Sequence, residues 1–92
     1  MILEIVTPEA VIFHSEVNSV AVPGINGSFQ MLKDHAPIVS LLDKGSIRIK
    51  GNQIEVMKEY ADQFSKEKDE LILNINGGTV EMNNNKIIIL AD

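Results

Sequence analysis

The chain has 92 residues and no cysteine, which excludes disulfides and thiolate metal sites. Its 13 acidic and 8 basic residues give a net charge of −5, and no basic patch of the kind that nucleic-acid-binding proteins carry is visible. The length predicts one domain, residues 1–92, with a modest core. Aromatic residues make up only 4%, so we expect that core to consist of aliphatic side chains.

The amino-terminal residues, MILEIVTPEA, have neither the basic region nor the long apolar region of a signal peptide. No apolar run approaches the roughly 18 residues that a membrane-spanning helix requires. We therefore expect no direct insertion into a membrane, although the protein can lie beside one through a partner.

Short apolar runs, separated by proline, glycine and asparagine, fill the first half of the chain. Such runs are typical of β-strands at the spacing of a β-sandwich. We expect strands at Ile2–Val6, Val11–Phe13, Glu16–Val22, Ser28–Leu32 and Ile38–Leu42. The last run is almost continuously apolar, so we expect it to be buried on both faces.

The middle of the chain begins with a clear strand and then changes character. Ser46–Lys50 alternates apolar and polar residues, and Gly51-Asn52 is expected to close a hairpin with Gln53–Met57 as the return strand. The following residues are charged, lack glycine and proline, and place apolar side chains at nearly helical spacing: Val56, Tyr60, Ala61 and Phe64. This pattern predicts a short helix or mobile excursion over Lys58–Lys66.

Strand patterns return at Leu71–Ile75, Val80–Met82 and Lys86–Leu90. Gly77-Gly78 permits a turn or a bulge, and the three consecutive asparagines at 83–85 predict another turn. The sequence therefore predicts a mainly β protein. Its expected fold is an antiparallel β-sandwich of about ten strands, with a short helix or loop insertion near residues 55–70.

Few residues have the spacing of catalytic or metal-binding groups. His14 and Glu16 could share one face of a strand, but a zinc site needs three or four ligands and no third is recognisable. Ser28, His35 and Ser40 are close in sequence without the spacing of an activated serine. We therefore expect no catalytic residue, no bound metal and no cofactor.

Several motifs, taken in order, resemble one known family. These motifs are the opening "IVTPE", the turn "PGINGSF", "HAP" followed by an apolar run and Gly45, "GGTVEM", and the closing "ILAD". Together they are similar to the epsilon subunit of the F-type ATP synthase. The resemblance covers Leu3 to Asp92 apart from the stretch after Lys50.

The resemblance implies a non-catalytic β-sandwich in the rotating central stalk. Such a subunit couples rotation of the ion-translocating membrane ring to ATP synthesis through contacts with the gamma subunit and with the ring (c) subunits. The implied location is peripheral, on the cytoplasmic face of a bacterial inner membrane. Ring contacts are expected at Ser28, Gln30, Met31, Asp34 and His35, and gamma contacts at Thr7, Ser40 and Leu42.

The sequence departs from the family in the stretch QMLKDHAP. Family members usually carry an acid at the position of Ser28, and they have Gly, Pro and Gly where this chain has Gln30, Lys33 and Asp34. Our hypothesis is that Asp34 supplies the missing negative charge toward the ring. In the same comparison His35 becomes a loop residue rather than a general base.

Two further departures concern length. Residues 53–69 are longer and more charged than the usual hairpin connection, so we interpret them as an insertion that is either solvent-exposed or an extra contact through Tyr60 and Phe64. Most family members also continue beyond "LAD" into a two-helix regulatory domain, whereas the sequence here ends at Asp92.

Two other functions remain alternatives at this point. The first is a free-standing β-sandwich that binds a ligand such as a carbohydrate, although a chain with one tyrosine, three phenylalanines and no tryptophan offers little for an aromatic platform. The second is a small hydrolase using His35 and Ser40, for which no orienting acid is recognisable.

Overall fold

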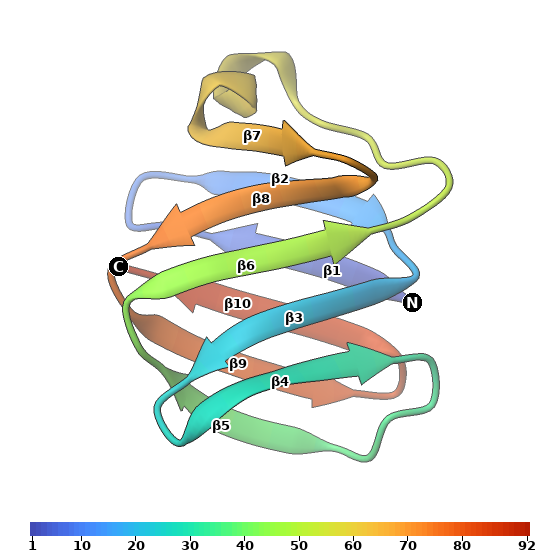
Figure 1. Cartoon of the computed structure of the whole chain (residues 1–92), viewed down its shortest axis with the longest axis vertical. Coiled ribbons are helices and arrows are strands. Elements are labelled where there is room, and N and C mark those ends of the chain that lie inside the picture. Colours follow the sequence, from blue (N-terminus) through green and yellow to red (C-terminus); the bar gives the residue numbers. More distant parts are fainter.

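The computed structural model describes all residues, 1–92, and contains ten strands and one short helix (Figure 1). The strands are β1 (Ile2–Val6), β2 (Val11–Glu16), β3 (Ser19–Gly24), β4 (Gly27–Leu32), β5 (Ile38–Leu42), β6 (Gly45–Lys50), β7 (Phe64–Glu67), β8 (Glu70–Ile75), β9 (Gly78–Asn83) and β10 (Lys86–Ala91). The helix, η1 (Lys58–Gln63), is a single 3₁₀ segment of six residues, and no helix in the chain could span a bilayer. The prediction of a mainly β fold is confirmed.

The strands form two layers that face each other (Figure 1). One layer has the order β2-β1-β10-β9-β5, and the other contains β3 between β4 and β6, followed by β8 and β7. The layers are continuous at one corner, where Gly24 of β3 pairs with Leu42 of β5. The sandwich is not wholly antiparallel, because the first and last strands, β1 and β10, pair in parallel.

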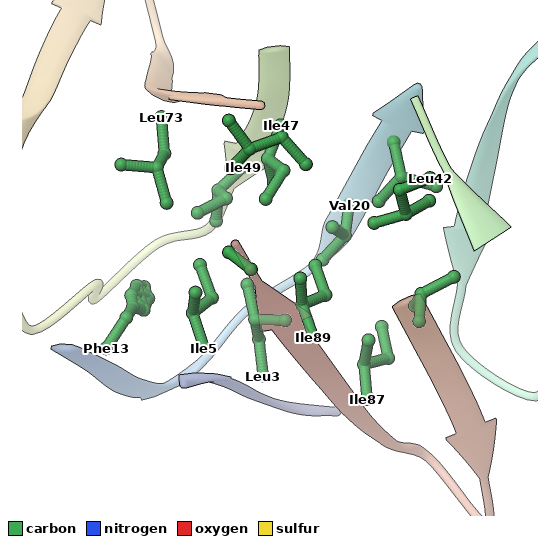
Figure 2. Close-up of a cluster of buried hydrophobic side chains, with 14 of the residues drawn as sticks. Leu3, Ile5, Phe13, Val20, Leu42, Ile47, Ile49, Leu73, Ile87 and Ile89 are labelled. Atoms are coloured by element: carbon green, nitrogen blue, oxygen red, sulfur yellow. The ribbon is translucent and has the colours of Figure 1, made fainter. Parts of the chain in front are cut away.

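The core between the layers is aliphatic, as the composition predicts (Figure 2). Ile47 and Ile49 of β6 are fully buried, and the residues that alternate with them face outward. They meet Leu3 and Ile5 of the opposite layer in the same cluster of 18 buried residues. At about 1.5–3 kcal/mol for each large apolar side chain buried, this cluster is the main source of stability.

Strand β5 is not buried on both faces, so that prediction was wrong. Val39 and Leu41 are 74% and 57% exposed, whereas Leu42 belongs to the core. The physical reason is that β5 lies in an outer layer with nothing packed on its far side. The apolar residues of this strand therefore divide between the core and solvent.

The predicted hairpin after β6 was also wrong, because Gln53–Met57 has no strand structure. Residues 51–63, which we call the strap, instead run from β6 to the short strand β7 by way of η1. The strap is tied to β2 by a hydrogen bond of 3.0 Å from the Glu55 amide to the Ser15 hydroxyl. Ile54 and Tyr60 of the strap pack against the core.

The strap closes the edge of the sandwich where β2 and β7 are the outermost strands of their layers. Phe64, just after it, packs on Phe13 with ring centroids 5.6 Å apart. Tyr60 and Phe64 are thus half-buried against the chain's own core. These two side chains are neither fully exposed to solvent nor free to contact a partner. That residues 53–69 are an insertion stays a prediction.

Candidate docking surface

The outer face of the layer β2-β1-β10-β9-β5 carries a row of apolar side chains. The register aligns Leu41 of β5 with Thr79, Leu90, Val6 and Val11 on the four neighbouring strands. Leu90 and Val11 are 51% and 40% exposed. Val6, Val11, Leu41 and Leu90 of this row, together with Val39 from the next row of the same face, are called the apolar stripe. At about 4.8 Å between strands, it extends roughly 19 Å across the sheet.

Acidic residues lie beside the apolar stripe. The next row of the same face places Val39 next to Glu81, then Ile88, then Glu4 and His14. Neither glutamate takes part in an ion pair, since Arg48 on the other layer makes both of the ion pairs in the structure. The face therefore combines exposed apolar side chains with unpaired negative charge.

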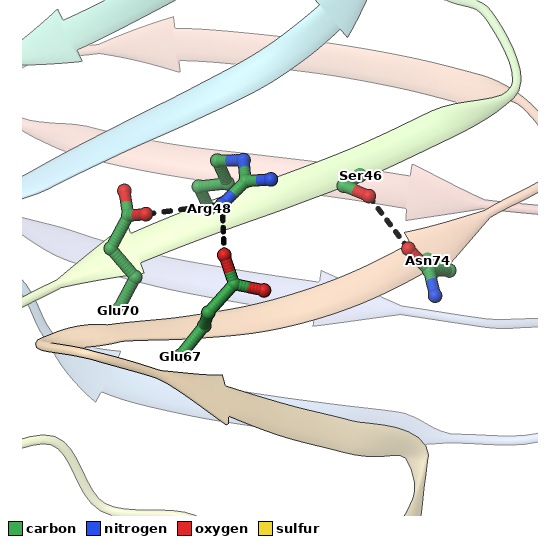
Figure 3. Close-up of polar contacts among 5 residues, drawn as sticks. All are labelled: Ser46, Arg48, Glu67, Glu70 and Asn74. Carbon is green, nitrogen blue, oxygen red and sulfur yellow. Dashed lines mark hydrogen bonds and ion pairs between the residues drawn. The ribbon is translucent and has the colours of Figure 1, made fainter.

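Over β6, β7 and β8, the outer face of the opposite layer is mainly polar, and charged side chains on it pair with one another (Figure 3); Leu32 of β4 is exposed at the edge of that layer. Arg48 of β6 lies 3.1 Å from Glu70 and 3.9 Å from Glu67, and Ser46 donates a 2.6 Å hydrogen bond to Asn74. The two faces differ in exposed apolar side chains, and contiguous exposed apolar side chains on a folded domain are typical of an interaction surface. The apolar stripe is the best candidate for one.

None of the three expected gamma contacts points outward from this stripe. Leu42 is buried in the core, and Ser40 pairs with buried Val80 and shares its inward face. Thr7 is half-buried in the β1–β2 turn, where its amide and hydroxyl both donate to the Ala10 carbonyl. The exposed residues are their neighbours Val39 and Leu41. Sequence reasoning missed them because four of the five residues in IVSLL are apolar, so the run does not show which of them face solvent.

The five expected ring contacts do not come together. Ser28 lies at the start of β4, whereas Asp34 and His35 follow its other end, and the strand from Ser28 to Leu32 extends about 13 Å. Gln30 is exposed, but Met31 is fully buried and its side chain is unavailable to a partner. The structure thus leaves Ser28 and Gln30 on the surface of β4.

Ser28 and Asp34 lie at opposite ends of β4, so this geometry does not favour Asp34 as the replacement for an acid at Ser28, and the compensation hypothesis stays a prediction. Another acid, Asp43 in the β5–β6 turn, lies at the same end of the sheet as Ser28 but across β3 from it. Its amide donates a 2.7 Å hydrogen bond to the carbonyl of Pro23, the pairing partner of Ser28. Sequence reasoning missed Asp43 because it is 15 residues from Ser28 in the chain, and the two come to the same end only through the corner of the sheet.

The histidine and serine of the hydrolase alternative are engaged separately. His35 Nδ1 lies 2.7 Å from the Ala36 carbonyl, and the Ser40 hydroxyl donates to the Leu41 carbonyl at 3.1 Å. Neither contact links the two residues. No group of three His, Asp or Glu side chains could hold a metal ion. Nothing in this geometry favours hydrolysis.

A family model for the β-sandwich domain of the ATP synthase delta/epsilon chain matches residues 1–92. The chain belongs to this family. Among its curated relatives is the ATP synthase epsilon chain of Chlorobaculum tepidum, which is 37% identical over 90 residues, covering 98% of this chain and 86% of the relative. The epsilon chain of Salinibacter ruber is 36% identical with the same coverage here, but only 56% of that relative is matched.

Two solved structures have the same fold. One is the central stalk and c-ring of the Tetrahymena thermophila mitochondrial ATP synthase, with a TM-score of 0.73 and 15% identity over 99% of this chain and 62% of that one. The other is a subcomplex of the Euglena gracilis mitochondrial ATP synthase, with a TM-score of 0.75 and 18% identity over 99% of this chain and 49% of that one. The delta/epsilon sandwich is thus confirmed as the fold.

Membership in the delta/epsilon family confirms the resemblance drawn from the sequence. It also makes the chain a non-catalytic subunit of an ATP synthase. The apolar stripe suits such a subunit, because a subunit of an assembly needs surfaces that hold partners rather than a cleft that holds a substrate.

Proposed function

We propose that this delta/epsilon chain binds the gamma subunit through the apolar stripe and transmits rotation between the membrane ring and gamma. The observation that carries the proposal is the exposed stripe itself. Val39, Leu41 and Leu90 are each more than half exposed, although they belong to a chain whose other large aliphatic residues mostly form one core.

The energetics favour a partner on this face. Completing the burial of a half-exposed Val or Leu contributes about 1 kcal/mol, so the stripe as a whole can contribute several. Stable protein interfaces usually bury at least about 1,000 Å² in total, and a stripe roughly 19 Å long lies within one surface of that size. A close-packed aliphatic sandwich behind the stripe resists deformation, as a body that transmits torque must.

We place the ring contact at the end of the sandwich that carries the β3–β4 and β5–β6 turns. Ile25, Asn26 and Ser28 are exposed there, and Asp43, whose amide binds the Pro23 carbonyl, supplies a negative charge at the same end. In this proposal Asp43 faces basic groups on the ring loops, while Asp34, at the other end of the sandwich, has a different task. The subunit is then held peripherally at the cytoplasmic face of a bacterial membrane through the ring.

The gamma contact is tested by mixing the chain with gamma from the same cell and measuring complex formation by size and by titration. The wild-type chain should form a one-to-one complex that survives at micromolar concentration. Leu41→Ser should weaken it at least tenfold, because an apolar contact is replaced by a hydroxyl without a partner. Val56→Ser is the matched control, since Val56 is also exposed but lies on the strap. Equal affinities for all three proteins would overturn the proposal.

The ring contact needs its own measurement. Binding of the chain–gamma complex to isolated rings should weaken in Asp43→Asn and should depend less on ionic strength, because one exposed charge has been removed. Asp69→Asn removes a charge from the β7–β8 turn at the far end of the sandwich and should bind like wild type. A normal salt dependence in Asp43→Asn would refute the placement.

A further inference from the structure

Two turns that are far apart in sequence are joined by a reciprocal pair of hydrogen bonds. The amide of Asp34 donates to Asn85 Oδ1 at 2.7 Å, and Asn85 Nδ2 donates to Asp34 Oδ1 at 3.0 Å. Asp34 lies in the β4–β5 loop and Asn85 in the β9–β10 turn. We call this pair the Asp34–Asn85 clamp.

The clamp also reaches the first strand. The carbonyl of Asn85 accepts a 2.9 Å hydrogen bond from the amide of Ile2, so one residue connects the β9–β10 turn, β1 and the β4–β5 loop. Asp34 and Asn85 have φ angles of 66° and 61°. Asp and Asn tolerate this left-handed region better than other non-glycine residues, and each brings the side-chain group that the clamp uses.

The start of β5 is paired on one edge only, although Ile38 also packs against the core. On one side β5 pairs with β9 along its length, but on the other side its only pairing is Leu42 with Gly24, at the end of the strand. Val39, near the start, therefore lies where one edge of the strand has no neighbour. The loop that leads into this end is the loop held by the clamp.

We propose that Asp34 and Asn85 are positioning residues that hold the start of β5 in place, so that Val39 and Leu41 are presented to gamma in a fixed arrangement. This inference rests on the proposed role of the apolar stripe. Its physical basis is preorganisation, because a strand that is already held loses less conformational freedom when the partner binds. The clamp thus acts on affinity without touching gamma.

Substitutions of Asp34 distinguish its hydrogen bonds to Asn85 from its negative charge. Asp34→Asn keeps the backbone donor and a side-chain carbonyl acceptor, so both hydrogen bonds can form while the charge is lost. Asp34→Gly removes the acceptor, and glycine adopts φ of 66° without strain. Lys68→Gly is a matched control, since Lys68 is exposed with φ of 56° in the turn after β7.

The first readout is hydrogen exchange of the isolated full chain. In Asp34→Gly, amides of Ile38–Leu42 should exchange about three- to tenfold faster, as expected for the loss of one exposed hydrogen bond and the loosening of its partner. Asp34→Asn and Lys68→Gly should leave β5 at the wild-type rate. Unchanged β5 exchange in Asp34→Gly would overturn the clamp, whatever gamma does.

The second readout is affinity for gamma. Asp34→Gly should bind about three- to tenfold more weakly, and Asp34→Asn should restore wild-type affinity. Equal weakening by both variants would show that the charge acts and the clamp does not. Leu41→Ser distinguishes failure of the clamp from failure of the docking surface. If that variant still binds gamma normally, the surface is wrong; if it loses binding while Asp34→Gly does not, only the clamp is wrong.

Discussion

Removing the phenyl ring of Phe64 tests whether the strap is a structural part of the sandwich. Phe64 lies at the junction of the strap and β7 and packs on Phe13 across the gap between the outermost strands of the two layers. In Phe64→Ala this gap is opened to solvent at the edge of the core. We expect the variant to fold but to be distinctly less stable than wild type.

The magnitude follows from burial. A fully buried Phe→Ala substitution costs about 3–5 kcal/mol, and Phe64 is only half-buried, so we expect a loss of about 2 kcal/mol. The tilted pair with Phe13 accounts for about 0.5–1.5 kcal/mol of that loss. For a domain of this size 1 kcal/mol shifts the melting temperature by about 4–8 °C, so the expected decrease is about 8–16 °C.

Thermal and urea unfolding, followed by far-ultraviolet circular dichroism, measure the effect directly. Phe64→Leu retains most of the apolar area but not the ring pair, so its loss should be about half as large. Val56→Ala, in the exposed part of the strap, should unfold within about 0.5 kcal/mol of wild type. If Phe64→Ala unfolds at the wild-type temperature, the strap does not close the core.

Three further substitutions have clear expectations for unfolding. Gly78→Ala should cost about 3 kcal/mol or prevent folding, because Gly78 has φ of 150° and an added Cβ would clash with the Leu90 carbonyl; yield and urea midpoint report this. Ile47→Val, at a fully buried position, should cost about 0.5–1.5 kcal/mol by urea unfolding. Arg48→Ala should cost under about 1 kcal/mol despite the 3.1 Å contact with Glu70, and any loss should shrink in high salt.

The sequence by itself determined most of the strands. Ile2–Val6 and Ile38–Leu42 have the predicted bounds, and the alternation of Ile47 and Ile49 with polar residues assigned the inward face of β6. These features were predictable because strand alternation is a local property with a period of two. The motifs around Pro23 and Gly78 helped to identify the family from the sequence. Turns and close backbone contacts restrict which residues fit at such positions.

Only the tertiary structure decided which apolar residues face solvent and which distant residues meet. Val39 and Leu41 are exposed because no element packs on the outer face of β5, and nothing within IVSLL records that. The Phe13–Phe64 contact, and the clamp between Asp34 and Asn85, join residues 51 positions apart. Such contacts depend on how the layers fold over each other, so the local sequence around either partner cannot specify them.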